Sequence, residues 1–216
     1  MKLKSAISAI VFVSALAAPA AAGTFEDAVE ANARGDYAKA LRLIRPLAND
    51  GNVTAQFNLG SMYLTGRGVQ LDYSAAALWF RKAAEQGYAH AQSNLGALYR
   101  DGRGVPEDYT EAVMWFRKAA DQGDAVAEFL LGNQYAFGKG VPQDYSEAMI
   151  WFRKAAEQGH ARAMHDLGVI YAKGLGVPMP LLGTWFGLRI FRRLSDRQFQ
   201  IAVNLLLVAA GAGLMV

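Results

Sequence analysis

The sequence WFRKAA occupies Trp79–Ala84 and recurs at Trp115–Ala120 and Trp151–Ala156. The spacing of the copies is constant, since 115 − 79 and 151 − 115 both equal 36 residues. A fixed period of this length is typical of proteins in which similar units stack in one array. Because each unit of such an array packs against its neighbours, the motif indicates a packing role rather than an active site.

Each period is expected to form two helices. In the first copy, Ala55, Leu59, Met62 and Tyr63 recur at the spacing of one helical face. A second apolar face begins at Tyr73 and includes the WFRKAA motif. Glycines are expected to end the helices, because they accept the left-handed backbone that helix ends often need. Aspartates stand where they can cap the second helices, at Asp72, Asp108 and Asp144.

Small residues recur inside the expected helices at a constant phase. The first helices carry a glycine at Gly60, Gly96, Gly132 and Gly168. A glycine within a helix costs about 1 kcal/mol relative to alanine, so its repetition indicates that a neighbouring helix approaches closely. We expect the indole rings of Trp79, Trp115 and Trp151 to fill the space beside these glycines.

The first copy reads VTAQFNLGSMYLTGRGVQLDYSAAALWFRKAAEQGY and covers residues 53–88. Further copies follow at residues 89–124 and 125–160, an incomplete copy at 161–178, and a divergent helix pair precedes them at 23–52. Over residues 24–178 this pattern resembles the Sel-one-like repeat, a relative of the tetratricopeptide repeat. The resemblance implies an all-α fold, a right-handed α-solenoid of stacked helix pairs that binds proteins or peptides. It brings no catalytic residues.

One stripe of the first helices changes between copies while the core positions stay constant. In tetratricopeptide-like solenoids the first helices line the concave face, so we expect a groove there for a protein or peptide. Asn58 and Asn94 would offer hydrogen bonds to a peptide backbone, and Leu130 and Phe137 an apolar anchor. The candidate partner-binding residues are Asn58, Ser61, Asn94, Leu130, Asn133, Phe137 and Asp166. Neutral drift of an exposed surface is the alternative explanation.

The composition argues against chemistry. The chain has no cysteine, and its three histidines, His90, His160 and His165, do not form a metal-binding motif. The glycine loops lack the pattern of a phosphate-binding loop. Residues 23–178 hold 16 basic and 18 acidic side chains, a balance of −2 that does not favour nucleic acid. Paired bases such as Arg81-Lys82 are expected to be neutralised by nearby acids such as Glu85. The sequence therefore predicts no enzyme, cofactor or metal.

The N-terminus has the three parts of a secretory signal peptide. Lys2 and Lys4 precede an apolar stretch at residues 6–18, and small residues follow at 19–22. We expect residues 1–22 to be a signal peptide that is cleaved after Ala22. An uncleaved membrane anchor is the alternative, although the apolar stretch is short for a transmembrane span.

The tail, residues 179–216, breaks the period. Phe199–Val216 contains no charged residue, and Met179–Ile190 is a shorter apolar segment, so one or two short membrane-type helices are expected. Residues 180–216 resemble the C-terminal end of the sulfite exporter TauE/SafE family, on the sequence GTWFGLRIFRRLSDRQFQ. The preceding membrane helices of that family are absent, so the resemblance does not imply transport. An ordinary membrane anchor is the alternative.

These observations predict a non-enzymatic, exported repeat scaffold that mediates protein or peptide interactions in the bacterial envelope. The predicted location is the periplasm, with anchoring to the inner membrane through contact of the tail with the lipid bilayer. The alternative is a component or remnant of a membrane transporter, in which the tail is the active part. A third possibility is a non-functional chimera, formed by a gene fusion or a frameshift that joins a repeat protein to the end of a transporter.

Overall fold

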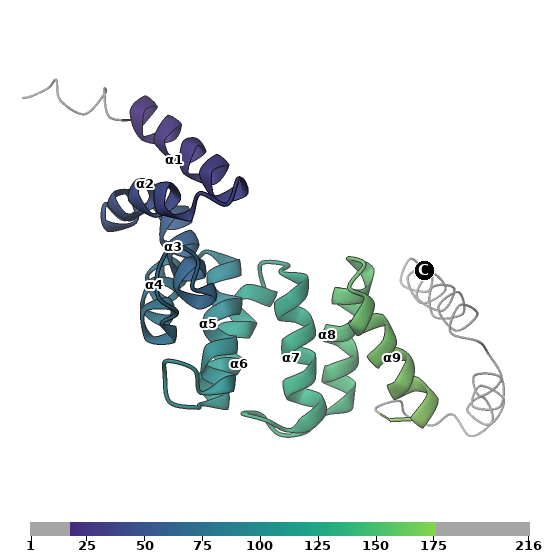
Figure 1. Cartoon of the computed structure of the whole chain (residues 1–216). Helices are drawn as coiled ribbons and strands as arrows, with labels where there is room; N and C mark the ends of the chain where they lie inside the picture. Colours follow the sequence, from purple (N-terminus) through teal and green to yellow (C-terminus); the bar gives the residue numbers. More distant parts are fainter. Residues whose placement is uncertain (1–17, 176–216) are drawn as a thin grey trace, which may run out of the picture. The chain divides into compact units, whose positions relative to one another are not determined.

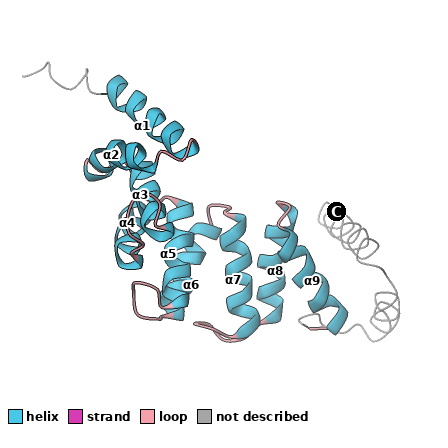
Figure 2. Ribbon diagram, viewed as in Figure 1, coloured by secondary structure: helices cyan, strands magenta, loops and turns pink. Residues whose placement is uncertain are grey.

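The computed structural model describes residues 18–175, and all the regular structure in that range is α-helical (Figures 1 and 2). The helices within it are α1 (Ala18–Ala33), α2 (Tyr37–Asn49), α3 (Val53–Thr65), α4 (Tyr73–Glu85), α5 (Ala89–Asp101), α6 (Tyr109–Ala120), α7 (Ala125–Phe137), α8 (Tyr145–Glu157) and α9 (Ala161–Lys173). Residues 18–22 of the predicted signal peptide belong to α1. The rest of that peptide and the predicted membrane helices of the tail lie outside the described residues.

The helices divide between two compact units. The first ends at Asp72 and contains α1, α2 and α3; the second begins at Tyr73 and contains α4 to α9. Within each unit, helices that follow one another in the chain are the ones that pack together. This confirms the expected all-α arrangement of stacked helix pairs. None of the helices within residues 18–175 is long and apolar enough to span a bilayer.

The helix ends follow the sequence pattern. The first helix of each copy ends at a glycine in the left-handed conformation, with φ of +69° at Gly66, +63° at Gly102 and +65° at Gly138. The expected aspartate caps are confirmed for α6 and α8, because Asp108 and Asp144 each accept hydrogen bonds from two backbone N–H groups at the helix start. The period thus fixes the length of every helix from α3 to α9 to within one residue.

The glycines inside the first helices pack against phenylalanine rings, not against tryptophan. A Cβ atom at Gly96 would lie 2.7 Å from the ring of Phe116, and one at Gly132 would lie 2.7 Å from the ring of Phe152. Both phenylalanine side chains are fully buried. The expectation that the tryptophans fill these spaces is therefore wrong. Because Trp and Phe are adjacent in the motif, they point in directions about 100° apart on the helix, and only Phe faces the glycine.

Each tryptophan ring of the motif instead contacts a lysine side chain. The ammonium groups of Lys82, Lys118 and Lys154 lie 4.2, 4.2 and 4.1 Å from the centres of the indole rings of Trp79, Trp115 and Trp151. A cation over an indole face is attracted by the ring electrons, and its stem covers apolar surface. The lysine of each motif thus covers the tryptophan three residues before it.

The arginines of the motif join one repeat to the next. Arg81 donates a hydrogen bond to the hydroxyl of Tyr99, Arg117 to that of Tyr135, and Arg153 to that of Tyr171 at 2.7 Å. The expectation that nearby acids neutralise these bases is wrong, since none of the ion pairs found in the described residues involves the motif bases. The side chains lie against aromatic rings, which the linear spacing of charges could not show.

A second contact between neighbouring repeats recurs with the same period. The loop glycine Gly104 lies against the backbone of Tyr73, and Gly140 lies against the backbone of Tyr109, so closely that a Cβ atom would overlap the carbonyl group. The neighbouring bases Arg103 and Lys139 cover the rings of the same tyrosines. Each loop therefore packs on the start of the second helix of the preceding repeat.

One buried polar position of the second unit recurs with the repeat, at Gln92 and Glu128. Gln92 donates from Nε2 to the carbonyl oxygen of Ala84 at 3.0 Å and accepts at Oε1 from Gln122 at 2.8 Å. One period later the residue is Glu128, which accepts from Gln158 at 2.8 Å. An ionised carboxylate has no hydrogen to donate, so Glu128 cannot repeat the bond that Gln92 donates to the carbonyl oxygen of Ala84. Burial raises the pKa of Glu128, and the hydrogen bond from Gln158 opposes this in part.

Candidate partner-binding surface

The first-helix stripe comprises four positions on each of the helices α3, α5, α7 and α9. All of its side chains are partly or fully exposed, whereas the adjacent core positions, such as Leu95 and Leu131, are fully buried. The stripe is therefore a surface, as the sequence predicts. Its members are Thr54, Asn58, Ser61 and Thr65 on α3; His90, Asn94, Ala97 and Asp101 on α5; Val126, Leu130, Asn133 and Phe137 on α7; and Arg162, Asp166, Val169 and Lys173 on α9.

The stripe on α3, in the first unit, is polar and bonded to its own helix. Asn58 donates from Nδ2 to the carbonyl oxygen of Thr54 at 2.8 Å, and the hydroxyl of Ser61 donates to the carbonyl oxygen of Phe57 at 3.0 Å. On α5, in the second unit, Asn94 donates in the same way to His90 at 2.7 Å. One N–H of each asparagine is thus used within the helix. The second N–H and the Oδ1 atom are the groups that each amide offers to a partner.

A histidine–aspartate pair lies at the start of the stripe in the second unit. Nδ1 of His90 lies 2.7 Å from Oδ2 of Asp124, whose side chain is only 3% exposed, while that of His90 is 65% exposed. Asp124 also caps α7 by accepting from the backbone N–H of Ala127 at 2.8 Å. The sequence pattern did not predict this pair. The period does place both residues at helix starts, one helix pair apart, and this spacing is the sequence feature from which the pair could have been predicted.

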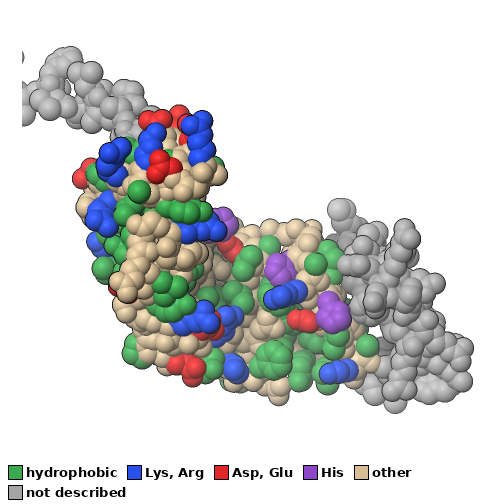
Figure 3. All heavy atoms as spheres, viewed as in Figure 1, with side chains coloured by type: hydrophobic (Ala, Val, Ile, Leu, Met, Phe, Trp, Pro, Cys, Tyr) green, Lys and Arg blue, Asp and Glu red, His purple; other side chains and the backbone are tan. Residues whose placement is uncertain are grey.

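The stripe on α7 is apolar where the others are polar. Val126 is 52% exposed and Phe137 is 69% exposed, and Leu130 is half-buried between them. Asn133 lies on the same stripe and has no hydrogen-bond partner for its side chain within the described residues. Exposed apolar side chains that gather on one helix face are typical of a surface that a partner covers. Figure 3 shows hydrophobic side chains with histidine and basic side chains beside them on the face that it displays.

A groove of about 400 Å³ runs between α7 and the start of α9. Val126, Phe129 and Leu130 line it from α7, and His160, Ala161 and Arg162 line it from the other side. The imidazole ring of His160 stacks on the ring of Phe129, with ring centres 4.5 Å apart. Two of the lining residues, Val126 and Leu130, belong to the apolar part of the stripe, so the stripe and the groove are continuous.

The stripe on α9 is charged. Arg162 and Lys173 are exposed and Asp166 is half-buried, and none of the three forms an ion pair within the described residues. On α5, by contrast, Asp101 is bound by Arg100 at 2.7 Å. The hydrogen bond from Arg100 lowers the pKa of Asp101, and burial works against it. The candidate residues from Asn94 to Asp166 therefore share one unit, while Asn58 and Ser61 belong to the other.

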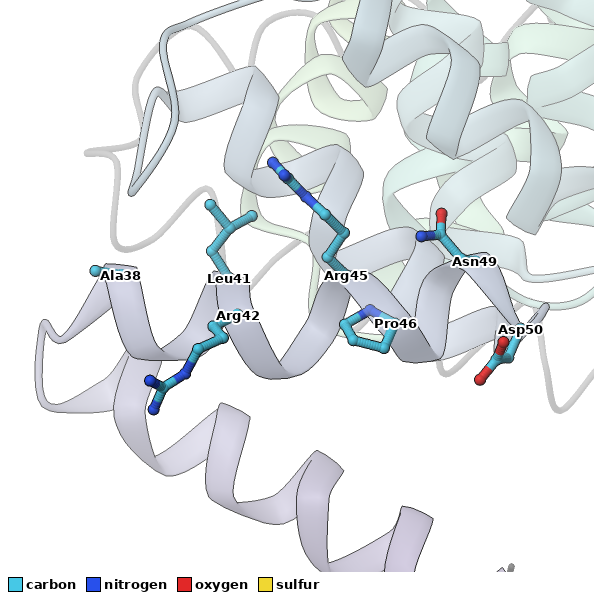
Figure 4. Close-up of a pocket in the computed structure, with 7 residues that line it drawn as sticks. All are labelled: Ala38, Leu41, Arg42, Arg45, Pro46, Asn49 and Asp50. Carbon is cyan, nitrogen blue, oxygen red and sulfur yellow. The ribbon is translucent and has the colours of Figure 1, made fainter.

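A second hollow, of about 620 Å³, lies along α2 in the first unit. Figure 4 shows its lining residues, all from α2 or the residue after it, with the side chains of Arg42 and Arg45 extending in different directions. Because the two guanidinium groups do not converge, they do not form a common anion site. Among the described residues, no three His, Cys, Asp or Glu side chains group as metal ligands would.

The chain is similar to solved structures. One is a protective antigen that is present in uropathogenic Escherichia coli strains and displays an SLR fold. It matches with 40% identity and a TM-score of 0.70 over 73% of this chain. A Sel1 repeat protein from Oxalobacter formigenes matches with 39% identity and a TM-score of 0.67 over 71% of this chain. The chain spans 34% of the first protein and 63% of the second. A search of curated proteins finds no match.

The comparison with family models identifies the repeat. The resemblance of residues 180–216 to the TauE/SafE family is not supported. The Sel1 repeat model matches residues 53–88, 89–124, 125–160 and 161–178, which together make up more than half of the 216 residues. These are the residues whose helices stack through the phenylalanine, arginine and loop-glycine contacts described above. The chain belongs to the Sel1 repeat family.

Proposed function

We propose that this protein is an exported scaffold of the bacterial envelope that holds a protein or peptide partner on the first-helix stripe. Sel1 repeat proteins are protein-interaction scaffolds. The observation that carries the proposal is the contrast within the second unit. Most core positions keep the same residue in every copy, whereas the exposed stripe changes from polar on α5 to apolar on α7 and charged on α9.

The proposed role is binding without catalysis. Two buried acids beside the stripe have structural roles: Asp124 caps α7, and Glu128 accepts a hydrogen bond from Gln158 inside the core. The exposed imidazole of His90 pairs with Asp124, but a nucleophile or a second acid–base group would have to converge on it for catalysis. A surface that varies on a constant framework is what a partner-specific scaffold requires.

Export is proposed from the N-terminal sequence. The basic residues, apolar stretch and small residues of positions 1–22 fit a secretory signal. The chain has no cysteine, and an exported protein of this size does not need disulfides when stacked repeats supply its core. The E. coli relative is described as a protective antigen, which fits a family member that lies outside the cytoplasm.

The apolar tail is proposed to tether the protein to the inner membrane. Fractionation of the full-length, tagged protein tests the tether, since carbonate-resistant membrane association is expected and full solubility would refute it.

Cross-linking in cells tests the binding role. A photo-reactive amino acid at position 94 or 137 should form a discrete covalent adduct with a partner. The matched control is position 150, because Ile150 is an exposed apolar residue of α8, outside the stripe. The variant with both Asn94→Ala and Phe137→Ala should lose the partner in a pull-down from the same cells, at unchanged helicity by circular dichroism. Equal adduct yields at positions 94, 137 and 150 would refute the proposal.

A further inference from the structure

The groove between α7 and the start of α9 differs from the corresponding surface one repeat earlier. There, the residues at the positions of Val126 and His160 are His90 and Asp124, and these two bind each other. Val126 cannot form such a bond. The groove is therefore open, with apolar side chains on the α7 side, where the preceding repeat has a closed polar pair.

The opposite edge of the groove offers hydrogen-bond donors. Nδ1 of His160 accepts a hydrogen bond from the backbone N–H of Ala163 at 3.2 Å. That nitrogen therefore carries no hydrogen, and in the neutral ring the hydrogen is on Nε2, which is a donor. The stacking of His160 on Phe129 fixes the orientation of the ring. Arg162, the next lining residue but one, adds an exposed guanidinium with no partner among the described residues.

Few acids compete for these donors. Asp124 is occupied by His90 and the start of α7, and Glu128 is buried and holds the amide of Gln158. Asp166 lies one helical turn after Arg162, at a distance along the helix that allows an ion pair, but the two are not paired. The groove thus has an apolar side and a positively charged side, without an internal counter-charge.

We propose that this groove binds an acidic, apolar segment of a partner protein. A bulky apolar side chain of the segment lies between Val126 and Leu130, and a carboxylate next to it binds the guanidinium of Arg162. Nε2–H of His160 supplies a second donor to the carboxylate or to the segment's backbone. This inference rests on the proposed function and adds the chemical class of the partner. Charge-assisted hydrogen bonds of this kind are among the stronger polar contacts in proteins.

The test uses the full-length protein in mild detergent and three fluorescein-labelled probe peptides. The first carries Glu and Phe side chains in a Gly-Ser background, the second has Lys in place of Glu, and the third has Ser in place of Phe. Fluorescence anisotropy should show binding of the first peptide, and binding about tenfold weaker or absent for the other two. Added salt should weaken the binding of the first peptide, because the carboxylate contact lies at an exposed edge.

Variants locate the contact. Arg162→Ala should weaken binding of the acidic peptide about tenfold, and Val126→Asp should weaken it at least as much because it adds a repelling charge. The controls are Lys173→Ala, an exposed base of α9 outside the groove lining, and Ile150→Asp, an exposed apolar residue of α8. Both should bind like the unaltered protein. The far-ultraviolet circular dichroism of each variant confirms that it folds.

The outcomes separate this inference from the proposed function. Equal binding of the Lys peptide, an effect of Lys173→Ala equal to that of Arg162→Ala, or no binding of the acidic peptide would each overturn the acidic-segment inference. Cross-linking at position 94 or 137 in cells would still support a partner on the stripe in any of these cases. Loss of that cross-linking, by contrast, removes the proposed function itself.

Discussion

The ring of Phe152 lies directly over Gly132, and a Cβ atom at that glycine would lie 2.7 Å from Cδ1 and Cε1 of the ring. Phe116 and Gly96 have the same relationship one repeat earlier. Glycine costs a helix about 1 kcal/mol relative to alanine, so at these positions the close approach of the two helices offsets the lower helix propensity.

Gly132→Ala should therefore destabilise the protein, by about 1 to 3 kcal/mol, although alanine is the better helix former. Urea unfolding followed by circular dichroism measures the free energy. The double variant Gly132→Ala with Phe152→Leu should be less destabilised than the sum of the two single changes, since the smaller side chain leaves room for the methyl group. Strict additivity would mean that the ring and the methyl group do not compete for the same space.

Gly140 and Gly159 both have positive φ angles, of +73° and +85°, but only Gly140 lies against another part of the chain, the backbone of Tyr109. Gly159→Ala should cost about 1 kcal/mol of stability from backbone strain alone. Gly140→Ala adds a steric overlap with the tyrosine carbonyl group and should cost at least about 2 kcal/mol more. Thermal unfolding of both variants gives the difference. Equal costs would show that the loop does not hold the neighbouring repeat.

Gln134 is a polar residue at a core position, where Met62, Leu98 and Ile170 stand in the other copies. Its side chain is 3% exposed, and its Oε1 atom has no hydrogen-bond partner. Gln134→Leu should raise the free energy of unfolding by about 1 to 2 kcal/mol, because it removes an unsatisfied buried acceptor.

The control for this change is Gln92→Leu. Gln92 is equally buried, but its amide makes two hydrogen bonds, to Ala84 and from Gln122. Its replacement should lower the free energy of unfolding, because the partner groups lose their bonds. A stabilising effect of both substitutions would indicate that apolar burial alone decides the outcome at these sites.

Glu128 should make stability depend on pH. Its folded-state pKa lies above the ordinary value of 4.5, mainly because burial disfavours the charged carboxylate. The folded protein therefore binds the proton more tightly than the unfolded chain. The resulting stability is complete below pH 4.5 and is lost as the pH rises through the raised pKa.

Glu128→Gln should remove this part of the pH dependence and stabilise the protein at neutral pH by about 1 kcal/mol, since glutamine is neutral and can also donate as Gln92 does. Urea unfolding across an acidic-to-neutral pH series checks it, with Glu111→Gln as a control in which the altered acid lies in the first turn of α6. A pH profile that is unchanged by Glu128→Gln but altered by Glu111→Gln would contradict the assignment.

The period of the sequence was sufficient for the helices and their ends. The recurrence of Leu59, Leu95 and Leu131 marks the buried face, and the glycines and aspartates mark the helix ends. The period could not say which of two adjacent aromatic residues faces a glycine, because Trp151 and Phe152 both repeat equally well. The structure assigns that contact to Phe152 because the two side chains leave the helix in different directions.

The candidate binding surface was predictable only in part. Spacing along one helix placed Leu130 and Phe137 on the same exposed stripe, and the structure agrees. Spacing along one helix could not predict contacts between helices, since the His90–Asp124 pair joins residues 34 apart and the Arg117–Tyr135 bond joins residues 18 apart. Charge spacing suggested local ion pairs for the arginines, but the aromatic rings of the next repeat were closer partners than the local acids.

The bonds that join neighbouring repeats occur at constant offsets, 18 residues from Arg81 to Tyr99 and 30 residues from Tyr109 to Lys139. If residues 89–124 were deleted, Arg81 would meet Tyr135 at the first offset and Tyr73 would meet Lys139 at the second. Unequal recombination between the near-identical copies can therefore lengthen or shorten such a gene without creating a mismatched junction. Evolution can in this way vary the number of surface modules independently of the packing that supports them.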